Sequence, residues 1–369
     1  MGKNMNRILF GIFFLSTLVS ADWYNASWLY RKQITVDHTQ VAGDLSNFPV
    51  LINDGADSDF LAHAKADGSD FVITESDGTT KLKREIEEYD STDGSLVLWF
   101  KAPSLLAAID TTYYVYYGNA AASEVNDADT WDANYIGVWH LMEDGATTRY
   151  DATVNDNDGI PSGGSAVVGQ IANADDLTGN AYIDITAAIN EFNSDTYTIE
   201  MWTYIHDNTL LHFYSMRDAD LIESWANYGE AGVYFRYGDW GAKLKWTYRF
   251  SEDVWGSVVW VGNSSTGRYI YHNGELVASG SGSWTAATQS GNFYLGKLDG
   301  LPFYFDGIID EVRISDIARD SSWIATEYNN QYTPATFLTL GSEESPAPAG
   351  GAKWRGYYDG KNLQIRRTQ

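Results

Sequence analysis

The chain contains no cysteine among its 369 residues. This absence excludes disulfides, thiolate metal sites and thiol nucleophiles. Stability must therefore come from buried area, hydrogen bonds or bound metal ions. Two hydrolase motifs are also missing, the Gly-x-Ser-x-Gly nucleophile elbow and the His-Glu-x-x-His zinc motif.

Positive charge is scarce as well. The chain has 24 Lys and Arg against 50 Asp and Glu, a formal net charge of −26 at pH 7. Such an acidic surface repels nucleic acids and anionic lipid headgroups, so we expect no nucleic-acid partner. It suits a saline or calcium-containing medium, in which cations screen the carboxylates.

The first residues are typical of a secretory signal peptide. Positive charges at Lys3 and Arg7 precede an almost continuously apolar run, 8–19, and small residues follow it. The run of about a dozen residues is too short to cross a bilayer as a helix. We therefore predict a signal peptide over residues 1–21, Asp22 as the first mature residue, and no membrane span after cleavage. The expected location is secreted, either extracellular or at the cell surface.

Short runs of alternating polar and apolar residues fill the rest of the chain, separated by Asp, Gly, Asn and Ser clusters. This pattern predicts half-buried antiparallel strands and an all-β fold. Single hydrophobic cores rarely grow beyond about 250–300 residues, and this chain is longer, so we expect two β-sandwich domains. Asn273-Gly274 predicts a two-residue hairpin, and Ser321–Asn329 predicts one short helix with Ser321 as its N-cap. The first six strands are expected at 31–36, 48–52, 71–74, 81–88, 96–101 and 113–117.

A first set of short motifs lies within residues 22–134: Trp23, Trp28, the run 30–36, Asn47 to Ile52, Asp67 to Asp70, Arg84 to Glu87 and Tyr114 to Asn119. With these motifs the segment resembles the family known as domain of unknown function 2341. Members of this family are secreted or cell-envelope proteins of bacteria and archaea, and they have no established activity. The resemblance therefore implies a location and a β-sandwich domain over residues 22–134, without a chemistry.

A second set of motifs follows within residues 135–344: Val138 to Leu141 with Glu143, the loop 151–159, Ala181 to Ile185, Tyr197 to Trp202, and the closing motif 305–315 with Ala318 and Arg319. With these motifs the segment resembles LamG-like domains, which are concanavalin A-like jelly-roll sandwiches. The resemblance implies a sandwich used for binding. After this segment the sequence has a Pro/Ala/Gly linker, 345–352, and a basic aromatic segment, 353–369.

Calcium is the cofactor that we expect, because the acidic loops of a sandwich supply the oxygen ligands that it takes. The resemblance implies a site assembled across the sandwich from Glu143, Asp151 and Asp310, with Asp158 as a further ligand. The alternative is that Asp158 is a turn residue and that Asp310 pairs with Arg313.

Aromatic residues make up 15% of the chain, and several rings gather in a segment rich in Gly and Asp. Rings beside polar loops can stack on the apolar face of a sugar. We predict ligand-binding roles for Trp225, Tyr237 and Trp240, the last within the turn-like segment 238–241. The alternative is that these rings belong to the core of the sandwich.

We predict a secreted, non-catalytic protein that binds glycans or extracellular polymers. No catalytic residue is assigned: the Glu-x-Asp-x-x-Glu motif of jelly-roll glucanases starts at Glu88-Tyr89-Asp90, but Asp93 occupies its last position. One alternative is a structural subunit of an extracellular filament or surface layer. A polysaccharide-active enzyme is the other.

The last 17 residues differ in charge from the rest of the chain. They include five cations and one acid, Asp359, together with several apolar residues, and Asp359-Gly360 could turn one short strand back on another. Such a segment is expected to contact an acidic surface and to support self-association by adding a strand to a sheet edge. The alternative is a solvated tail.

Overall fold

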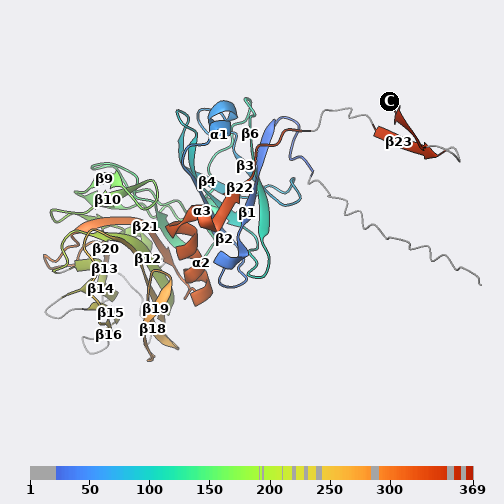
Figure 1. Ribbon diagram of the computed structural model, residues 1–369. Helices are drawn as coiled ribbons and strands as arrows, with labels where there is room; N and C mark the ends of the chain where they lie inside the picture. The colour runs from blue at the N-terminus through green and yellow to red at the C-terminus, as the bar shows by residue number, and fades with distance from the viewer. Residues whose placement is uncertain are drawn as a thin grey trace, which may run out of the picture.

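The computed structural model describes residues 22–190, 192, 195–209, 211–217, 222–227, 232–237, 243–283, 291–346, 353–358 and 363–368. The predicted signal peptide, most of the predicted linker and Trp240 lie outside these residues. The described chain forms antiparallel sheets that pack as two sandwiches, which confirms the all-β prediction (Figure 1).

The first sandwich consists of a sheet with strand order β22-β1-β6-β3 and a sheet with order β2-β5-β4. Its core includes Ile34, Val50, Ile73, Leu98 and Val115, all with 0% exposure. They lie on predicted strands whose apolar residues point inward, as the alternation indicates. The elements are β1 (Tyr30–Val36), η1 (His38–Gln40), β2 (Phe48–Asp54), α1 (Ser58–His63), β3 (Val72–Glu75), β4 (Arg84–Asp90), β5 (Ser95–Ala102), β6 (Thr111–Tyr117) and η2 (Ala128–Thr130).

The second sandwich packs a sheet of order β19-β18-β17-β12-β21-β10-β9 against a sheet of order β16-β15-β14-β13-β20-β11-β8, and β7 also pairs with β21. The core between them includes Trp139, Phe213, Trp260 and Phe293. The elements are β7 (Tyr135–Trp139), β8 (Ile160–Ser162), β9 (Ser165–Val168), β10 (Asn173–Asp176), β11 (Tyr182–Asp184), η3 (Thr186–Asn190), β12 (Thr196–Ile205), β13 (Leu211–Arg217), β14 (Ile222–Ala226), β15 (Val233–Tyr237), β16 (Lys243–Trp246), β17 (Trp255–Asn263), β18 (Gly267–His272), β19 (Glu275–Gly280), β20 (Asn292–Leu295) and β21 (Gly307–Ser315).

After β21 the chain returns to the first sandwich through α2 (Ser321–Tyr332), α3 (Pro334–Phe337) and β22 (Leu338–Leu340). In Figure 1, α2 and α3 lie between the two lobes. β22 pairs with β1 from Ile34 to Val36, and Phe337 is fully buried in the first core. The first sandwich is therefore completed by residues that the predicted boundary at residue 344 assigns to the second.

The N-cap of α2 is Asp320 rather than Ser321. The Asp320 carboxylate accepts a hydrogen bond of 2.8 Å from the backbone N–H of Trp323. The predicted cap was wrong by one residue. Aspartate and serine cap helices equally well, so composition alone did not distinguish the two.

The predicted hairpin at Asn273-Gly274 is confirmed. These residues connect β18 to β19 with φ angles of 50° and 78°. Both residues of a type I′ turn need positive φ, which Asn and Gly adopt most readily. In the C-terminal segment, β23 (Lys353–Tyr358) and β24 (Leu363–Thr368) pair antiparallel as a two-stranded sheet.

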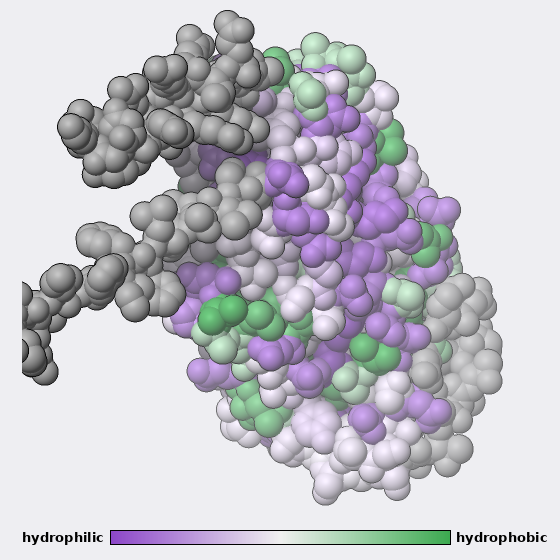
Figure 2. All heavy atoms as spheres, turned by 90° about the vertical axis from the view of Figure 1, so that its right-hand side faces the viewer, coloured by the Kyte–Doolittle hydropathy of each residue, from purple (hydrophilic) through white to green (hydrophobic). Residues whose placement is uncertain are grey.

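The face of the molecule in Figure 2 is mainly hydrophilic, and hydrophobic residues appear on it in small separate groups. Within the described residues, no helix is both long and apolar enough to cross a membrane.

Candidate functional site

The predicted calcium ligand Asp151 organises its own loop. Its Oδ1 atom accepts hydrogen bonds from the backbone N–H groups of Val138 (2.9 Å) and Thr153 (3.0 Å), and its Oδ2 atom accepts one from Asn157 (2.9 Å). Asp158 Oδ1 in turn accepts from the Asp151 N–H at 3.0 Å. These contacts tie the loop after β7 to that strand.

The other two predicted ligands hold separate loops. Asp310 Oδ2 accepts hydrogen bonds from the N–H groups of Gln170 (2.8 Å) and Ile171 (3.0 Å), while Glu143 Oε1 accepts from Tyr150 (3.1 Å). No three of the four predicted ligands offer donor atoms within 4.8 Å of one another. In this structure local N–H groups orient each of the four carboxylates separately, while Asp310 Oδ1 and Glu143 Oε2 are buried without a hydrogen-bond partner among the described residues. Calcium binding by the protein stays a prediction.

The structure buries two of the three predicted ligand-binding rings. Trp225 is 3% exposed and stacks on Tyr234 (5.1 Å between ring centroids) and on His212 (6.3 Å). Tyr237 is 5% exposed and belongs to the core of the second sandwich. The core alternative therefore describes Tyr237, whereas Trp225 is covered by neighbouring side chains and is not part of the core between the two sheets. Trp240 lies outside the described residues.

A pocket of about 280 Å³ lies at one end of the second sandwich. Three loops form it: the β10–β11 loop, the β12–β13 loop and the loop before β21. The loop before β21 is held by backbone hydrogen bonds, since His206 N–H donates to the Asp306 carbonyl (3.0 Å) and Phe305 N–H donates to the Gly296 carbonyl (2.8 Å). The lining residues combine carboxylates, an amide, a hydroxyl and aromatic rings: Gly179, Asn180, Asp207, Thr209, Pro302, Phe303, Tyr304, Phe305 and Asp306. We call this the rim pocket.

Half-buried aromatic rings continue from the rim pocket across the outer face of the β20–β11 pair. Tyr304 lies 6.4 Å from Tyr182, and Tyr182 packs edge-to-face with Tyr294 at 5.3 Å. The ammonium group of Lys297 lies over both rings of this pair, at 4.1 Å and 4.7 Å from their centroids. This surface therefore offers aromatic rings for apolar contacts and, beside them, hydroxyl, carboxylate and ammonium groups for hydrogen bonds, the two kinds of contact that a sugar can make.

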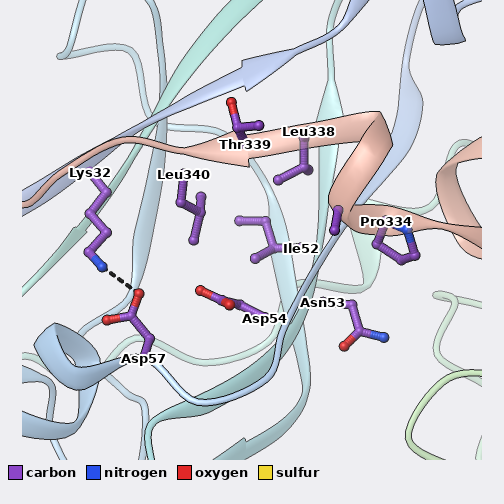
Figure 3. A pocket seen from close by; sticks show the side chains of 10 residues that line it. Lys32, Ile52, Asn53, Asp54, Asp57, Pro334, Leu338, Thr339 and Leu340 are labelled. Carbon is purple, nitrogen blue, oxygen red and sulfur yellow. Dashed lines mark hydrogen bonds and ion pairs between the residues drawn. The ribbon is translucent and has the colours of Figure 1, made fainter.

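A second pocket, of about 320 Å³, lies where the returning chain closes the first sandwich. Figure 3 shows the Asp54 carboxylate directed toward the ion pair between Lys32 and Asp57. Lys32 also pairs with Asp59 at 2.9 Å. Burial and the neighbouring Asp57 raise the pKa of Asp54. The apolar wall of this pocket consists of Ile52, Pro334, Ala335, Leu338 and Leu340.

A group of buried charges joins the two sandwiches. His140, just after β7, places its Nδ1 atom 2.7 Å from Glu311 Oε1 and 3.3 Å from Glu87 Oε2, and its Nε2 atom 3.6 Å from Glu85 Oε2. The indole N–H groups of Trp99 and Trp131 donate to Glu87 (2.8 Å) and Glu85 (2.7 Å). We call Glu87, His140 and Glu311 the junction cluster.

The charges of the junction cluster depend strongly on one another. Burial opposes a charge on His140, but the carboxylates of Glu311, Glu87 and Glu85 outweigh it and raise its pKa well above the ordinary value. Burial, together with Glu311, raises the pKa of Glu87 to about 8. Burial alone would raise the pKa of Glu311, but His140 and Arg313 lower it.

The guanidinium group of Arg313 lies between the rings of Trp99 and Trp131, at 4.4 Å and 4.8 Å from their centroids. It pairs with Glu311 at 2.6 Å and with Glu327 of α2. One buried cation thus connects β21, α2 and the first sandwich. An ion pair between Arg313 and Asp310 was the alternative to a calcium site. Asp310 lies on the same strand as Arg313, but its carboxylate accepts hydrogen bonds from the backbone N–H groups of residues 170 and 171 instead.

Sequence reasoning did not find the junction cluster. Glu87 and Glu88 are neighbours on a strand and point to opposite faces, since the Glu87 side chain is fully buried and Glu88 is exposed. One signal in the sequence could have indicated this cluster. Glu85 and Glu87 occupy alternate positions of β4 and therefore share one face of the strand, and two acids on a buried face need partners.

Two family models match the chain, in the order that the sequence predicted. Residues 67–153 match the domain of unknown function DUF2341, and residues 177–325 match the concanavalin A-like lectin/glucanases superfamily. The first match extends past the predicted boundary at residue 134 and includes β7. No curated protein matches the sequence.

Several solved structures resemble part of the chain at low identity. Domain 4 of AbnA, an extracellular arabinanase from Geobacillus stearothermophilus solved with arabinotriose, is 18% identical with a TM-score of 0.45, over 53% of this chain and 98% of that one. The binding domain of Paraclostridial Mosquitocidal Protein 1 is 16% identical (TM-score 0.43), over 53% of this chain and 52% of that one. The receptor binding domain of botulinum neurotoxin D is 13% identical (TM-score 0.43), over 54% and 53%. The chain spans about half the length of these two toxin domains.

Proposed function

For a chain that carries a DUF2341 segment followed by a concanavalin A-like domain, we propose a secreted, non-catalytic protein that binds glycans through the rim pocket of its second domain. The observation that carries this proposal is the composition of that pocket. Carboxylate, amide and hydroxyl groups stand beside aromatic rings on three loops at one end of the sandwich.

The rim pocket supplies the two kinds of contact that a sugar uses. The carboxylates of Asp207 and Asp306 can accept hydrogen bonds from sugar hydroxyl groups, and the side chains of Asn180 and Thr209 can donate or accept them. Tyr304 offers a half-buried ring for the apolar face of a pyranose or furanose. One Asp207 oxygen already accepts a hydrogen bond from the Thr209 N–H at 2.9 Å, which orients the carboxylate. The pocket is therefore partly preorganised, and a ligand loses less entropy on binding to it than on binding to a mobile side chain.

The charge of the pocket selects among glycans. Two carboxylates line it, and the whole protein carries a net charge of −26. Polymers with uronic acids or sulfate groups are repelled by such a surface. The proposed ligand is therefore a neutral glycan. The rings of Tyr182 and Tyr294, next to the rim pocket, extend its contact with the protein beyond one sugar unit.

A glycan array with the purified chain, followed by titration calorimetry on the best neutral oligosaccharide, tests this proposal. We expect Asp306→Asn to weaken binding about tenfold, because a hydrogen bond to a charged group contributes about 1.5–3 kcal/mol. Tyr304→Ala should weaken binding similarly. Glu88→Gln is the matched control, since it removes an exposed carboxylate on the first sandwich and should leave binding unchanged.

Two results would contradict the proposal. One is an array on which anionic glycans bind best, and the other is equal binding by Asp306→Asn, Tyr304→Ala and Glu88→Gln. The non-catalytic part is tested separately by incubating the protein with each bound glycan and measuring released reducing ends. Release above a heat-inactivated sample would identify a polysaccharide-active enzyme.

The second candidate is a structural subunit of an extracellular filament. The pairing of β23 with β24 favours it, because a hairpin of basic residues can add to the exposed edge of a sheet in an acidic neighbour. Deletion of residues 346–369 should then abolish assembly in electron micrographs of secreted material. Assembly that persists after the deletion would exclude this role for the hairpin.

A further inference from the structure

The junction cluster has the spacing of a metal site. Glu87, His140 and Glu311 each offer a ligand atom within 4.8 Å of the other two. The Nδ1 atom of His140 is 3.3 Å from Glu87 Oε2 and 2.7 Å from Glu311 Oε1. Ligand atoms around tetrahedral zinc are about 3.3 Å apart, since each lies about 2.0–2.2 Å from the metal. The distance from His140 Nδ1 to Glu87 Oε2 already fits this spacing. The distance from His140 Nδ1 to Glu311 Oε1 would have to lengthen by about 0.6 Å.

Two buried atoms of the cluster have no hydrogen-bond partner among the described residues: Glu87 Oε1 and His140 Nε2. The Glu87 side chain is 0% exposed and that of His140 is 8% exposed, so water does not readily satisfy either atom. Buried polar atoms usually have a partner, and these two unpaired atoms belong to residues whose other ligand atoms already lie close together. A metal ion would use the free electron pairs of Glu87.

Negative charge exceeds positive charge around this histidine. Three carboxylates, those of Glu85, Glu87 and Glu311, lie within 3.6 Å of the His140 ring nitrogens. The buried cation Arg313 is shared between Glu311 and Glu327. Protons on His140 and, below about pH 8, on Glu87 offset two of these charges, and one divalent ion can replace both protons without changing the total charge.

From this geometry we propose that Glu87, His140 and Glu311 bind one zinc ion that links the two sandwiches. One imidazole and two carboxylates form a donor set that zinc accepts. In this arrangement the metal takes Nδ1, and the Nε2–H of His140 points to Glu85 Oε2, 3.6 Å away. A carboxylate behind a metal-bound histidine orients the ring and strengthens the ligand.

Neighbouring side chains hold both carboxylates in place. The Trp99 indole donates to Glu87 Oε2 at 2.8 Å, and Arg313 Nη2 lies 2.6 Å from Glu311 Oε2. Glu311 itself has a φ of 48° inside a strand, at the place where the β12–β21 register shifts. A bulge of this kind redirects a side chain, and here it accompanies the turn of Glu311 toward His140.

Zinc content of the purified full-length chain tests this proposal. A chelator first removes bound metal from the protein, which is then reloaded with Zn²⁺ and separated from free metal by gel filtration. Its zinc content is measured by inductively coupled plasma mass spectrometry. We expect one zinc per chain and a higher thermal midpoint than for the stripped protein. Cobalt substitution should show the visible absorption bands of a tetrahedral site.

Three variants locate the metal. Glu87→Gln and His140→Gln should retain at least tenfold less zinc, and Glu87→Gln preserves the shape of the side chain if His140→Gln folds poorly. His38→Gln is the control, because His38 belongs to the other group of possible ligands, Asp37, His38 and Asp110, of which none is buried. His38→Gln should retain zinc fully. The proposal is overturned if the wild-type chain retains no zinc, if Glu87→Gln retains as much as wild type, or if His38→Gln loses it.

Discussion

His212 should make the second sandwich sensitive to acid. Its ring is stacked between Trp225 on β14 and Phe303 of the loop before β21, at centroid distances of 6.3 Å and 5.8 Å, and the residue is 3% exposed. Its Nδ1 atom is buried without a hydrogen-bond partner among the described residues. Burial, together with the charge of Arg236, lowers the pKa of His212 from 6.5 to about 3. Arg236 itself pairs with Glu223 at 3.1 Å.

The sign of the effect follows from proton binding. In the unfolded chain this histidine takes up a proton below about pH 6.5, whereas in the folded chain it stays neutral until about pH 3. The unfolded state therefore binds more protons in this interval, and stability falls as the pH falls. For one such group the loss of unfolding free energy is about 2 kcal/mol at pH 5 relative to pH 7.

Urea unfolding of wild type and His212→Phe at pH 7 and pH 5 measures this loss. Phenylalanine preserves the stack and cannot be protonated, so the variant should gain about 2 kcal/mol on wild type when the pH falls from 7 to 5. His38→Asn, which alters an exposed histidine, is the control and should show no such gain. An equal free-energy difference between His212→Phe and wild type at both pH values would refute the reasoning.

Three further predictions concern stability in the part of the chain that the structure describes. Phe337→Ala removes a fully buried ring from the core of the first sandwich, and we expect a loss of about 3–5 kcal/mol in the unfolding free energy measured in denaturant. Arg313→Met leaves Glu311 and Glu327 buried without their cation, and chemical unfolding should show a loss of about 3–5 kcal/mol at pH 7; a change below 1 kcal/mol would contradict this. Gly274→Ala places a Cβ at a φ of 78°, so thermal unfolding should show a loss of about 1 kcal/mol or more.

The strands of both sandwiches follow from the sequence because their side chains repeat with a period of two. The predicted segment 113–117 is part of β6, and the predicted segment 48–52 is part of β2. The hairpin at Asn273-Gly274 is similarly local, since two neighbouring residues supply the positive φ angles. In the same way, the family resemblances rest on short motifs, and both family models match in the predicted order.

The candidate sites were less predictable because they depend on which loops meet. The motif acids Asp151 and Asp310 are buried, as a site would require, but their oxygens accept hydrogen bonds from the backbone of separate loops. Tyr237 lies on a strand face that the sequence left undecided between core and solvent, and the structure places it in the core. The rim pocket combines the β12–β13 loop, which contains Asp207, with the loop before β21. No local pattern connects those two segments.

By itself the sequence determined the elements of this protein: an acidic, cysteine-free chain with alternating strands and a tight Asn-Gly turn. Each of these depends on residues within a few positions of one another. Tertiary structure decided how the ends of the chain meet. It brought Leu338 to Leu340 back to β1 across some 300 residues, and it placed His140 between Glu87 and Glu311. Burial supplies the physical reason, because an apolar strand edge and a buried charge each need a partner, and only the folded chain determines which distant residue provides it.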